Sequence, residues 1–383
     1  MELQIVKYLK EHGLDKTVSD FKLKCREYPH KVILKYDQLN SSYENPEVCE
    51  ARGLVLEKGT WRVLSLAYEK FFNVEEGYAA KIDWESAIVM EKCDGSLITL
   101  YYDDVINEWC TATTGTANGE GDVNSQLGFN FSDLFWQTAK KYNINKENCE
   151  LNKNYCYMFE LQTPYNIVVV PHTESKITWL GMRNRITLKE VSYNEMLRLS
   201  HQFAIIEGVR LDVVQSFPIE QPDFGWLKRK FKDMSMFDEG FVVVDKYFNR
   251  VKVKNPSYIE LHHTKTSTGL GITVKIIQTN EIDEWLIACP ERRDEIMDLK
   301  RRYDSFANDL ESIWFELQYF LPRDITPEEK KKFASKVFEL CGQRDLKQYS
   351  GLYFGLQNGK IPSVKDYLFD YDSKDLFYIL EKR

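Results

Sequence analysis

The chain has 383 residues, of which 43% are hydrophobic, 14% aromatic and 29% charged. This is a globular composition, and the length fits two domains better than one. It excludes disordered, collagen-like and low-complexity proteins, and no segment approaches the roughly 18 consecutive apolar residues of a membrane span. The net charge of −8 argues against a protein that coats nucleic acid without specificity.

Between about residues 31 and 260 the sequence favours short strands separated by turns. Runs of β-branched and aromatic residues predict strands at 31–36, 53–56, 86–90, 97–102, 166–170, 240–244 and 250–254. Helices are expected near 1–12, with a stop at Gly13, and at 131–142 and 192–204. Because helices and strands do not alternate regularly, we expect an α+β domain of antiparallel sheets rather than a doubly wound parallel sheet.

After about residue 265 the pattern becomes helical. Apolar residues recur at intervals of three and four from Ile296 to Phe320, which predicts one seam of a long amphipathic helix that begins near Pro290. Such a seam could form a coiled-coil dimer or pack within one chain against a helix that begins near Pro327. We favour packing within the chain.

Start and stop signals define the remaining helices. Thr326 precedes Pro327 and stands three residues before Glu329, a strong N-terminal pattern for a helix that Gly342 would end. Ser363 could cap a further helix, and Asp372 or Ser373 another. The last third of the chain is therefore predicted to be an all-α domain.

Chemistry is indicated first by the segment Lys92-Cys93-Asp94-Gly95-Ser96, which lies between two predicted strands. The spacing K-x-D-G-S arises by chance in roughly one percent or fewer of chains this long. The ordinary alternative is a type I turn without function.

A second signal is the pair Lys252 and Lys254 in the strand predicted at 250–254. Residues i and i+2 of a strand point the same way, so the two cations share one face. They could bind a phosphate, or they could simply mark a solvated edge strand. Near Lys92 they would repel its ammonium and so favour the neutral amine that acts as a nucleophile.

Four further segments accompany these motifs: Cys49-Glu50-Ala51-Arg52-Gly53, Tyr68-Glu69-Lys70-Phe71-Phe72-Asn73, Glu160-Leu161-Gln162-Thr163-Pro164-Tyr165-Asn166-Ile167-Val168 and Tyr258-Ile259-Glu260-Leu261-His262-His263-Thr264-Lys265. The motif order, Lys-x-Asp-Gly-Ser, Phe-Glu, Glu-Gly-Phe-Val and Lys-x-Lys, resembles that of the covalent nucleotidyltransferases, which include polynucleotide ligases and mRNA capping enzymes. Over roughly residues 30–270 the chain resembles the phage-type, ATP-dependent RNA ligase 1 family of tRNA-repair ligases.

The resemblance implies two domains. Residues 1–265 would form an adenylyltransferase domain, an ATP-grasp-like nucleotidyltransferase fold of antiparallel sheets with flanking helices. Residues 266–383 would form a helical domain that selects the RNA. The implied activity is the joining of RNA 3′-hydroxyl and 5′-phosphate ends through a lysyl-AMP and an adenylylated RNA, in RNA or tRNA repair.

The resemblance also implies roles for single residues. Lys92 would take AMP from ATP, and Glu160 and Tyr258 would act in catalysis beside it. The ATP-binding residues would be Tyr36, Arg52, Lys70, Asp94, Gly95, Glu160, Lys252 and Lys254. Glu239 and Asp283 would serve the metal, Mg²⁺ or Mn²⁺.

The implied partner is RNA with 5′-phosphate and 3′-hydroxyl ends, such as a cleaved tRNA, prepared by a separate polynucleotide kinase-phosphatase. Because the N-terminus lacks the apolar region of a signal peptide and no segment has the length of a membrane span, we expect a location in the cytoplasm, the host's if the protein is viral. We also expect a monomer. The eight scattered cysteines lack zinc spacing and are expected to be reduced.

Alternatives remain at this stage. The stretch Ala112-Thr113-Thr114 lacks the basic residues that family members commonly carry there. A capping guanylyltransferase or DNA ligase would share the motifs but would continue into a β-rich OB-fold, and a nucleotide- or RNA-binding pseudo-ligase would lack turnover. The basic clusters 300–302 and 330–332 could touch RNA phosphates or form solvated helix faces, and His262 and His263 are expected to be structural.

Overall fold

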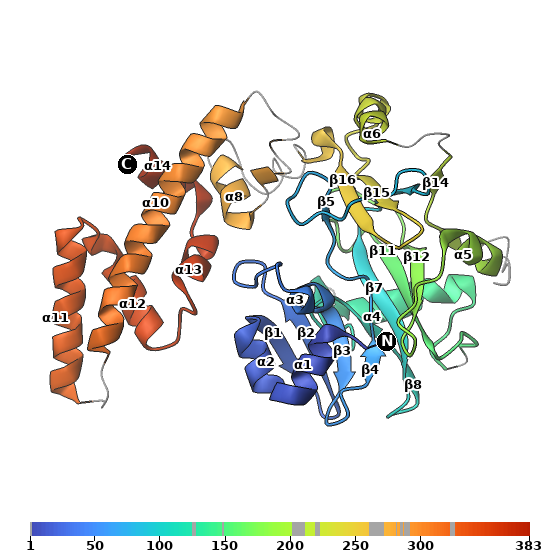
Figure 1. Ribbon diagram of the computed structural model, residues 1–383, viewed down its shortest axis with the longest axis horizontal. Helices are drawn as coiled ribbons and strands as arrows, with labels where there is room; N and C mark the ends of the chain where they lie inside the picture. The colour runs from blue at the N-terminus through green and yellow to red at the C-terminus, as the bar shows by residue number, and fades with distance from the viewer. Residues whose placement is uncertain are drawn as a thin grey trace. The chain divides into compact units, whose positions relative to one another are not determined.

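The computed structural model describes residues 2–124, 128–147, 149–200, 211–218, 223–259, 272–280, 282–283, 286, 292–321 and 326–383. The chain divides into two compact units, Met1–Tyr258 and Ile259–Arg383 (Figure 1). The predicted boundary between residues 265 and 266 lies outside the described residues, as do His262, His263 and Pro290. No helix in the described ranges is both long enough and apolar enough to cross a lipid bilayer.

The first unit begins with two helices, α1 (Gln4–His12) and α2 (Leu14–Asp20), which meet at Gly13. Gly13 has φ +82° and its N–H donates to Leu9 O, so the predicted helix stop is confirmed. A four-stranded antiparallel sheet follows in the order β1 (Leu23–Glu27), β2 (Lys31–Tyr36), β3 (Arg52–Glu57) and β4 (Val63–Ser65), with α3 (Pro46–Glu50) between β2 and β3. Apolar residues of α1, β2 and β3 form one core cluster.

Two five-stranded sheets complete this unit. The catalytic sheet, as we name it, has the order β14 (Ser216–Phe217), β6 (Ile88–Glu91), β15 (Gly240–Val244), β16 (Arg250–Lys254) and β5 (Phe72–Asn73). The facing sheet, so named here, has the order β13 (Asp212–Val213), β12 (Lys176–Asn184), β11 (Tyr155–Gln162), β7 (Ser96–Asp103) and β8 (Glu108–Ala112). Neighbours are antiparallel except β16 with β5 and β12 with β13, which confirms the predicted mixed α+β class.

Short elements surround these sheets. Helix α4 (Phe131–Ala139) continues into a 3₁₀ turn, η1 (Lys140–Tyr142), and contributes to the core of the facing sheet. Helix α6 (Phe224–Lys230) and η2 (Phe231–Asp233) pack on Phe241 of β15. Helix α5 (Tyr193–Ser200) matches the described part of the helix predicted at 192–204. Strands β9 (Asp122–Asn124) and β10 (Phe129–Asn130) form a separate ribbon.

One predicted strand is wrong. Residues 166–170 form bends and irregular backbone between β11 and β12 rather than a strand. The N–H groups of Val169 and Val170 donate to the carboxylate of Asp94 and not to a neighbouring strand. The β-branched composition of this run therefore gave a wrong prediction. The backbone N–H groups that would pair with a neighbouring strand instead donate to the buried Asp94 side chain.

The second unit is helical in its described part and is coloured orange to red in Figure 1. It contains α8 (Ile272–Thr279), α10 (Arg293–Leu317), η5 (Gln318–Phe320), α11 (Pro327–Gln343), η6 (Lys347–Tyr349), α12 (Ser350–Gln357), α13 (Val364–Asp370) and α14 (Ser373–Glu381). The α10 seam and apolar residues of α11 share one core cluster, which confirms packing within the chain. Phe320, the last residue of the predicted seam, is instead exposed in η5.

The predicted helix starts of this unit are confirmed by side-chain caps. Thr326 accepts a hydrogen bond from the N–H of Glu329, and Ser363 caps α13. Asp372, rather than Ser373, caps α14. Helix α11 ends at Gln343, one residue beyond the expected Gly342.

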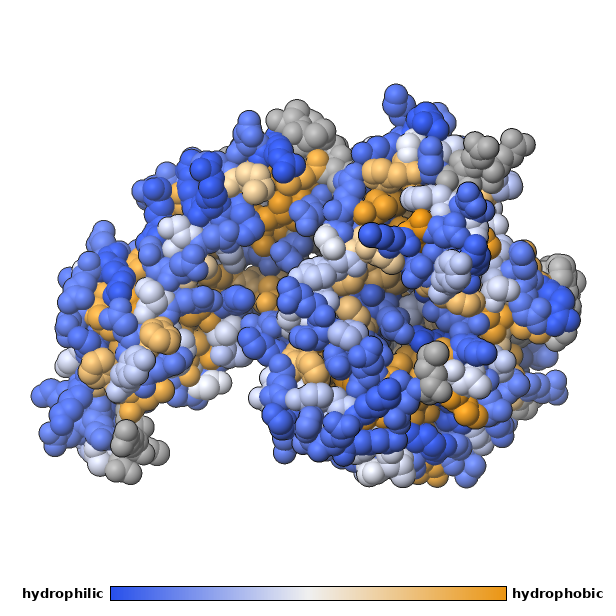
Figure 2. Space-filling model, in the orientation of Figure 1, coloured by the Kyte–Doolittle hydropathy of each residue, from blue (hydrophilic) through white to orange (hydrophobic). Residues whose placement is uncertain are grey.

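The first predicted basic cluster, residues 300–302, pairs with acids of the same unit. Lys300 contacts Asp304, while Arg301 and Arg302 both contact Asp298. In the second cluster Lys332 contacts Glu328. These pairs favour solvated helix faces, and Figure 2 shows hydrophilic side chains over most of the visible surface of this unit.

Candidate active site

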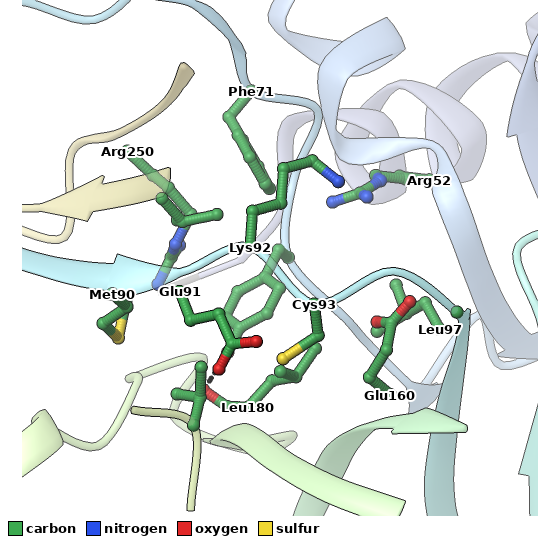
Figure 3. A pocket seen from close by; sticks show the side chains of 14 residues that line it. Arg52, Phe71, Met90, Glu91, Lys92, Cys93, Leu97, Glu160, Leu180 and Arg250 are labelled. Atoms are coloured by element: carbon green, nitrogen blue, oxygen red, sulfur yellow. Dashed lines mark hydrogen bonds between the residues drawn. The ribbon is translucent and has the colours of Figure 1, made fainter. Parts of the chain in front are cut away.

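A cavity of about 230 Å³ lies in the first unit, and residues of both five-stranded sheets line it (Figure 3). Its lining consists of Arg52, Tyr68, Phe71, Met90, Glu91, Lys92, Cys93, Gly95, Leu97, Glu160, Leu180, Val214, Val242 and Arg250. A volume of about 230 Å³ lies just below the roughly 300–1,000 Å³ of typical ligand sites, so this cavity is too small for a length of polymer. Four of the residues predicted from the sequence, Lys92, Arg52, Gly95 and Glu160, therefore line one cavity.

Lys92 enters the cavity from the turn that joins β6 to β7. Its backbone N–H donates to Gly240 O at 2.9 Å, which ties the turn to β15. Its amine donates to the carboxylate of Glu239, the residue just before β15. The Lys92 side chain keeps 22% of its surface exposed. The amine is therefore held by a carboxylate and remains reachable from the cavity.

Asp94 is buried and holds this turn in place. Its carboxylate accepts hydrogen bonds from the N–H groups of Val169 and Val170 and from the hydroxyl of Tyr258 at 3.0 Å. Burial raises the pKa of Tyr258, so this phenol stays a hydrogen-bond donor at neutral pH. Tyr258 thus contacts Asp94 in the structure and does not itself line the cavity, which suits a positioning residue.

Gly95 is required by close packing. A Cβ atom built on Gly95 would lie 2.6 Å from Leu161 O and 3.0 Å from the Glu160 side chain. No larger residue fits here unless the turn or β11 moves. The glycine therefore lets the Lys92 turn approach the strand that carries Glu160.

Glu160 lies within β11 and is buried. Burial raises its pKa to about 8; the nearby Lys92 lowers it, and the carboxylates of Glu239 and Asp94 raise it. Glu160 therefore keeps its proton at neutral pH in this arrangement and can donate as well as accept a hydrogen bond. Strongly perturbed carboxyl groups in a cavity are typical of functional sites.

Arg52 and Arg250 add positive charge on two sides of the cavity. The Arg52 guanidinium lies 5.0 Å from the centre of the Phe71 ring, and burial lowers the pKa of Arg52. Arg250 stacks 4.0 Å from the centre of the Tyr68 ring. It also forms two hydrogen bonds to the carboxylate of Glu190, at 2.8 and 3.3 Å. Both planar cations are thus fixed against aromatic rings.

The prediction that Lys252 and Lys254 share a face agrees with the burial of β16. Val251 and Val253 are buried, whereas both lysines are half-buried on the other side of the strand. Lys252 lies opposite Val242, whose side chain lines the cavity. Directly opposed residues share a face of the sheet. Lys252 and Lys254 therefore project from the cavity side of the catalytic sheet.

Lys70 and Tyr36 lie together outside the lining of this cavity. The Lys70 amine is 5.4 Å from the centres of the Tyr36 and Tyr43 rings and 5.2 Å from that of Phe72. Its backbone N–H donates to Cys49 O. The two predicted phosphate-binding residues are thus neighbours, and their contact with a nucleotide stays a prediction.

The predicted metal residues lie in different units. Glu239 is buried beside Lys92, whereas Asp283 is exposed and belongs to the second unit. In the described ranges, no three residues of the types His, Cys, Asp and Glu gather closely enough to hold a metal ion. Both assignments stay predictions.

Sequence reasoning missed several lining residues, of which Arg250 carries the clearest chemistry. It shares the parity of Lys252 and Lys254 in the same strand, and this signal was available in the sequence. Its partner Glu190 is 60 residues away, and no local pattern links the two. Glu91 and Cys93 flank Lys92 and also line the cavity.

Comparison with known proteins identifies the family. A family model described as RNA ligase matches residues 50–258, more than half of the chain. The chain belongs to this RNA ligase family.

Individual proteins resemble the chain over much of its length. An RNA ligase of Rhodothermus phage RM378 is 27% identical, covering 82% of this chain and 84% of that protein. A protein of Autographa californica nuclear polyhedrosis virus, whose name couples polynucleotide kinase with RNA ligase, is 24% identical over 80% of this chain and 44% of that protein. A solved archaeal ATP-dependent RNA ligase has a TM-score of 0.44 at 12% identity, covering 88% of this chain and 79% of that one, a similarity too low to carry an argument.

Proposed function

We propose that this chain is an ATP-dependent RNA ligase that joins RNA 3′-hydroxyl and 5′-phosphate ends through a lysyl-AMP intermediate. The observation that carries the proposal is the placement of Lys92. Lys92 lines one cavity with Arg52, Arg250 and Glu160, and its amine donates to Glu239. A lysine nucleophile needs a fixed position, a proton acceptor and nearby positive charge, and this cavity supports all three.

In the first step the Lys92 Nζ attacks the α-phosphorus of ATP. A nitrogen–phosphorus bond forms, the bond between the α-phosphorus and the bridging oxygen breaks, and pyrophosphate leaves. Glu239 already accepts a hydrogen bond from the amine and is placed to take its proton. Lys252 and Lys254 face the same side and would stabilise the charge that develops on the α-phosphate.

The second and third steps reuse these charges. An RNA 5′-phosphate oxygen attacks the phosphorus of lysyl-AMP and releases the Lys92 amine, so that AMP caps the RNA. A 3′-hydroxyl then attacks the capped phosphate and AMP leaves with the bonding electrons. Because each step moves similar negative charge at nearly the same place, fixed cations such as Lys252, Lys254 and Arg52 serve all three.

A divalent cation, Mg²⁺ or Mn²⁺, fits the donors near the nucleophile. Mg²⁺ keeps several waters and is commonly bound through one or two carboxylates and substrate phosphates, so a full protein cage is not needed. Glu239 is the carboxylate beside Lys92 that would bind it directly or through water. Glu160 carries a proton at neutral pH in the absence of the ion, and a bound cation would favour its ionised form and so let it bind the ion as well. The ion would neutralise phosphate charge. Asp283 remains a separate proposal.

The substrate and partners are proposals of the same kind. RNA with a 5′-phosphate and a 3′-hydroxyl, such as a cleaved tRNA, would be selected with help from the second unit. In its described part this unit contains helices and no strand, which favours an RNA ligase over a capping enzyme or DNA ligase with an OB-fold. A separate polynucleotide kinase-phosphatase would prepare the ends, and the chain would act as a cytoplasmic monomer.

Pre-adenylylated RNA tests this proposal because it bypasses the first step. Lys92→Ala should fail to join 5′-phosphate RNA with ATP, yet should join pre-adenylylated RNA without ATP. The wild-type chain should do both. Failure of the wild-type chain with both substrates would overturn the ligase proposal and favour a nucleotide- or RNA-binding protein. Equal joining of 5′-phosphate RNA by Lys92→Ala would overturn the role of Lys92.

A further inference from the structure

Residues 163–175 connect β11 to β12 and form a loop that is pinned to the nucleophile turn. The loop closes at its base, where the hydroxyls of Thr163 and Ser175 lie 2.9 Å apart. Within it, the Asn166 side-chain amide donates to Ser96 Oγ at 2.7 Å. Compact loops closed in this way are frequently functional.

The same loop is also hydrogen-bonded to Asp94. The N–H groups of Val169 and Val170 donate to its carboxylate, and the His172 ring nitrogen lies 2.9 Å from Asp94 O. The loop is thus hydrogen-bonded to Asp94 in the turn that presents Lys92 and to Ser96 at the start of β7. The loop therefore has a fixed position relative to the nucleophile.

The tip of the loop exposes apolar side chains. Tyr165 is 42% exposed, Ile167 is 50% exposed and Val168 is 42% exposed. The Phe129 ring lies beside Tyr165, with 5.9 Å between the ring centres. A run with strand composition would normally bury these side chains. Tyr165, Ile167 and Val168 do not line the cavity, but they are exposed together on a loop that is hydrogen-bonded to the Lys92 turn, and grouped exposed apolar residues commonly mark a binding surface.

The chemistry of the tip favours a base over a phosphate. Residues 163–171, Thr-Pro-Tyr-Asn-Ile-Val-Val-Val-Pro, contain no charged side chain. Phosphates are bound by cations and by hydrogen-bond donors, whereas unpaired bases stack on aromatic rings. An RNA that reacts with AMP on Lys92 must also place its terminal nucleotides close to the Lys92 turn, to which this loop is hydrogen-bonded.

We propose that Tyr165, Ile167 and Val168 form a docking surface for an unpaired base at the end of the RNA that reacts at Lys92. Tyr165 supplies the stacking ring, while Ile167 and Val168 extend the apolar platform. This inference rests on the proposed ligase function and assigns part of its RNA specificity to the first unit. It implies a preference for ends with unpaired terminal bases.

The test compares Tyr165→Ala, Tyr165→Phe and the control Tyr247→Ala, which removes a 67% exposed tyrosine from the turn between β15 and β16. Lysyl-AMP formation without RNA is measured first and should be the same in all. Tyr165→Ala should then raise the KM for single-stranded RNA by roughly 5- to 150-fold, the factor expected from one stacked base. Tyr165→Phe and Tyr247→Ala should stay within about twofold of the wild type, since a phenylalanine ring still stacks.

RNA with abasic terminal nucleotides distinguishes stacking from a general loss of structure. The wild-type chain should bind this RNA as weakly as Tyr165→Ala binds normal RNA, and Tyr165→Ala should lose little more. Unchanged RNA KM in Tyr165→Ala, as expected if a protein partner used this surface instead, would overturn the inference and leave the ligase function intact. A wild-type chain that forms no lysyl-AMP would overturn the proposed function itself.

Discussion

Lys31 and Lys92 both lie in the first unit, and each donates a hydrogen bond to a carboxylate from a distant part of the chain. The Lys31 amine contacts Asp103 and the Tyr101 hydroxyl, both at 2.9 Å, and its side chain is only 1% exposed. The Lys92 amine contacts Glu239 and faces a cavity of about 230 Å³. Both lysines have the same kind of partner, and the space around the amine differs.

The space around the amine distinguishes a structural lysine, Lys31, from a candidate nucleophile, Lys92. Space beside Lys31 is filled by protein, so its amine holds β2 against β7 and reaches no ligand. Space beside Lys92 is open and lined by two arginines and a carboxyl group of raised pKa. An ion pair alone therefore does not indicate catalysis, whereas an ion pair at a cavity with perturbed neighbours does.

The largest effect is expected from a substitution that removes the ion pair between Lys31 and Asp103. Lys31→Met should lower the free energy of unfolding by up to about 3–5 kcal/mol, because the buried Asp103 would keep the partly exposed His30 ring as a side-chain partner but would lose this cation. Adding Asp103→Leu should recover much of the loss, since the uncompensated charge is then gone. Urea unfolding measures both.

Lys16→Met is the matched control for that experiment. Lys16 pairs with Asp20 at 2.8 Å on the exposed face of α2, so its loss should leave stability nearly unchanged. Folded Lys31→Met should still form lysyl-AMP at the wild-type rate. A Lys31→Met chain that is stable but fails to form lysyl-AMP would contradict the structural assignment of Lys31.

The next effect concerns the cations on the cavity face of β16. Lys252→Ala or Lys254→Ala should slow lysyl-AMP formation by about 10²- to 10³-fold, because each removes charge stabilisation at the α-phosphate. Rapid-quench measurement with labelled ATP gives the rate. The control Lys246→Ala, at the β15–β16 turn and paired with Asp83, should keep the wild-type rate. Equal rates of lysyl-AMP formation in all three variants would show that Lys252 and Lys254 do not stabilise charge in this step.

The last effect is a pH dependence of stability that Glu160 produces. Its pKa rises from an ordinary value of 4.5 to about 8 on folding, so the folded chain keeps a proton that the unfolded chain has released. Stability should therefore fall as pH rises between these two values, by at most about 1.4 kcal/mol per pH unit, and level off above them.

Glu160→Gln removes this titration and provides the measurement. The difference in unfolding free energy between the wild type and Glu160→Gln should shift in favour of the variant from pH 5 to pH 8. Other titrating groups, such as Glu91, are present in both chains, and their contributions cancel in the difference. A difference that does not change with pH would show that Glu160 titrates at an ordinary pKa.

Local patterns in the sequence predicted a large part of this structure. The stop at Gly13, the cap at Thr326 and the alternation of β16 each depend on residues within a few positions, so each could be predicted. The cluster of Lys92, Arg52 and Glu160 was predicted through the resemblance of motif order, not through spacing.

Long-range capture of polar groups could not be predicted. Tyr258 donates a hydrogen bond to Asp94, which is 164 positions away in the sequence, and Arg250 donates to Glu190, which is 60 positions away. The strand expected at 166–170 failed for the same reason, because the Asp94 carboxylate accepts the N–H groups that a neighbouring strand would have paired. Such contacts depend on which segments the fold brings together, so the residue composition of a single segment does not predict them.

Intact-mass spectrometry after incubation with Mg²⁺ and ATP tests the central claim, that Lys92 is a nucleophile and not a second structural lysine. We expect an adduct of the mass of AMP on the wild type and on Lys31→Met, and no adduct on Lys92→Ala. GTP in place of ATP should give no adduct. A wild-type chain that binds ATP yet forms no adduct, or an adduct that persists in Lys92→Ala, would contradict the account.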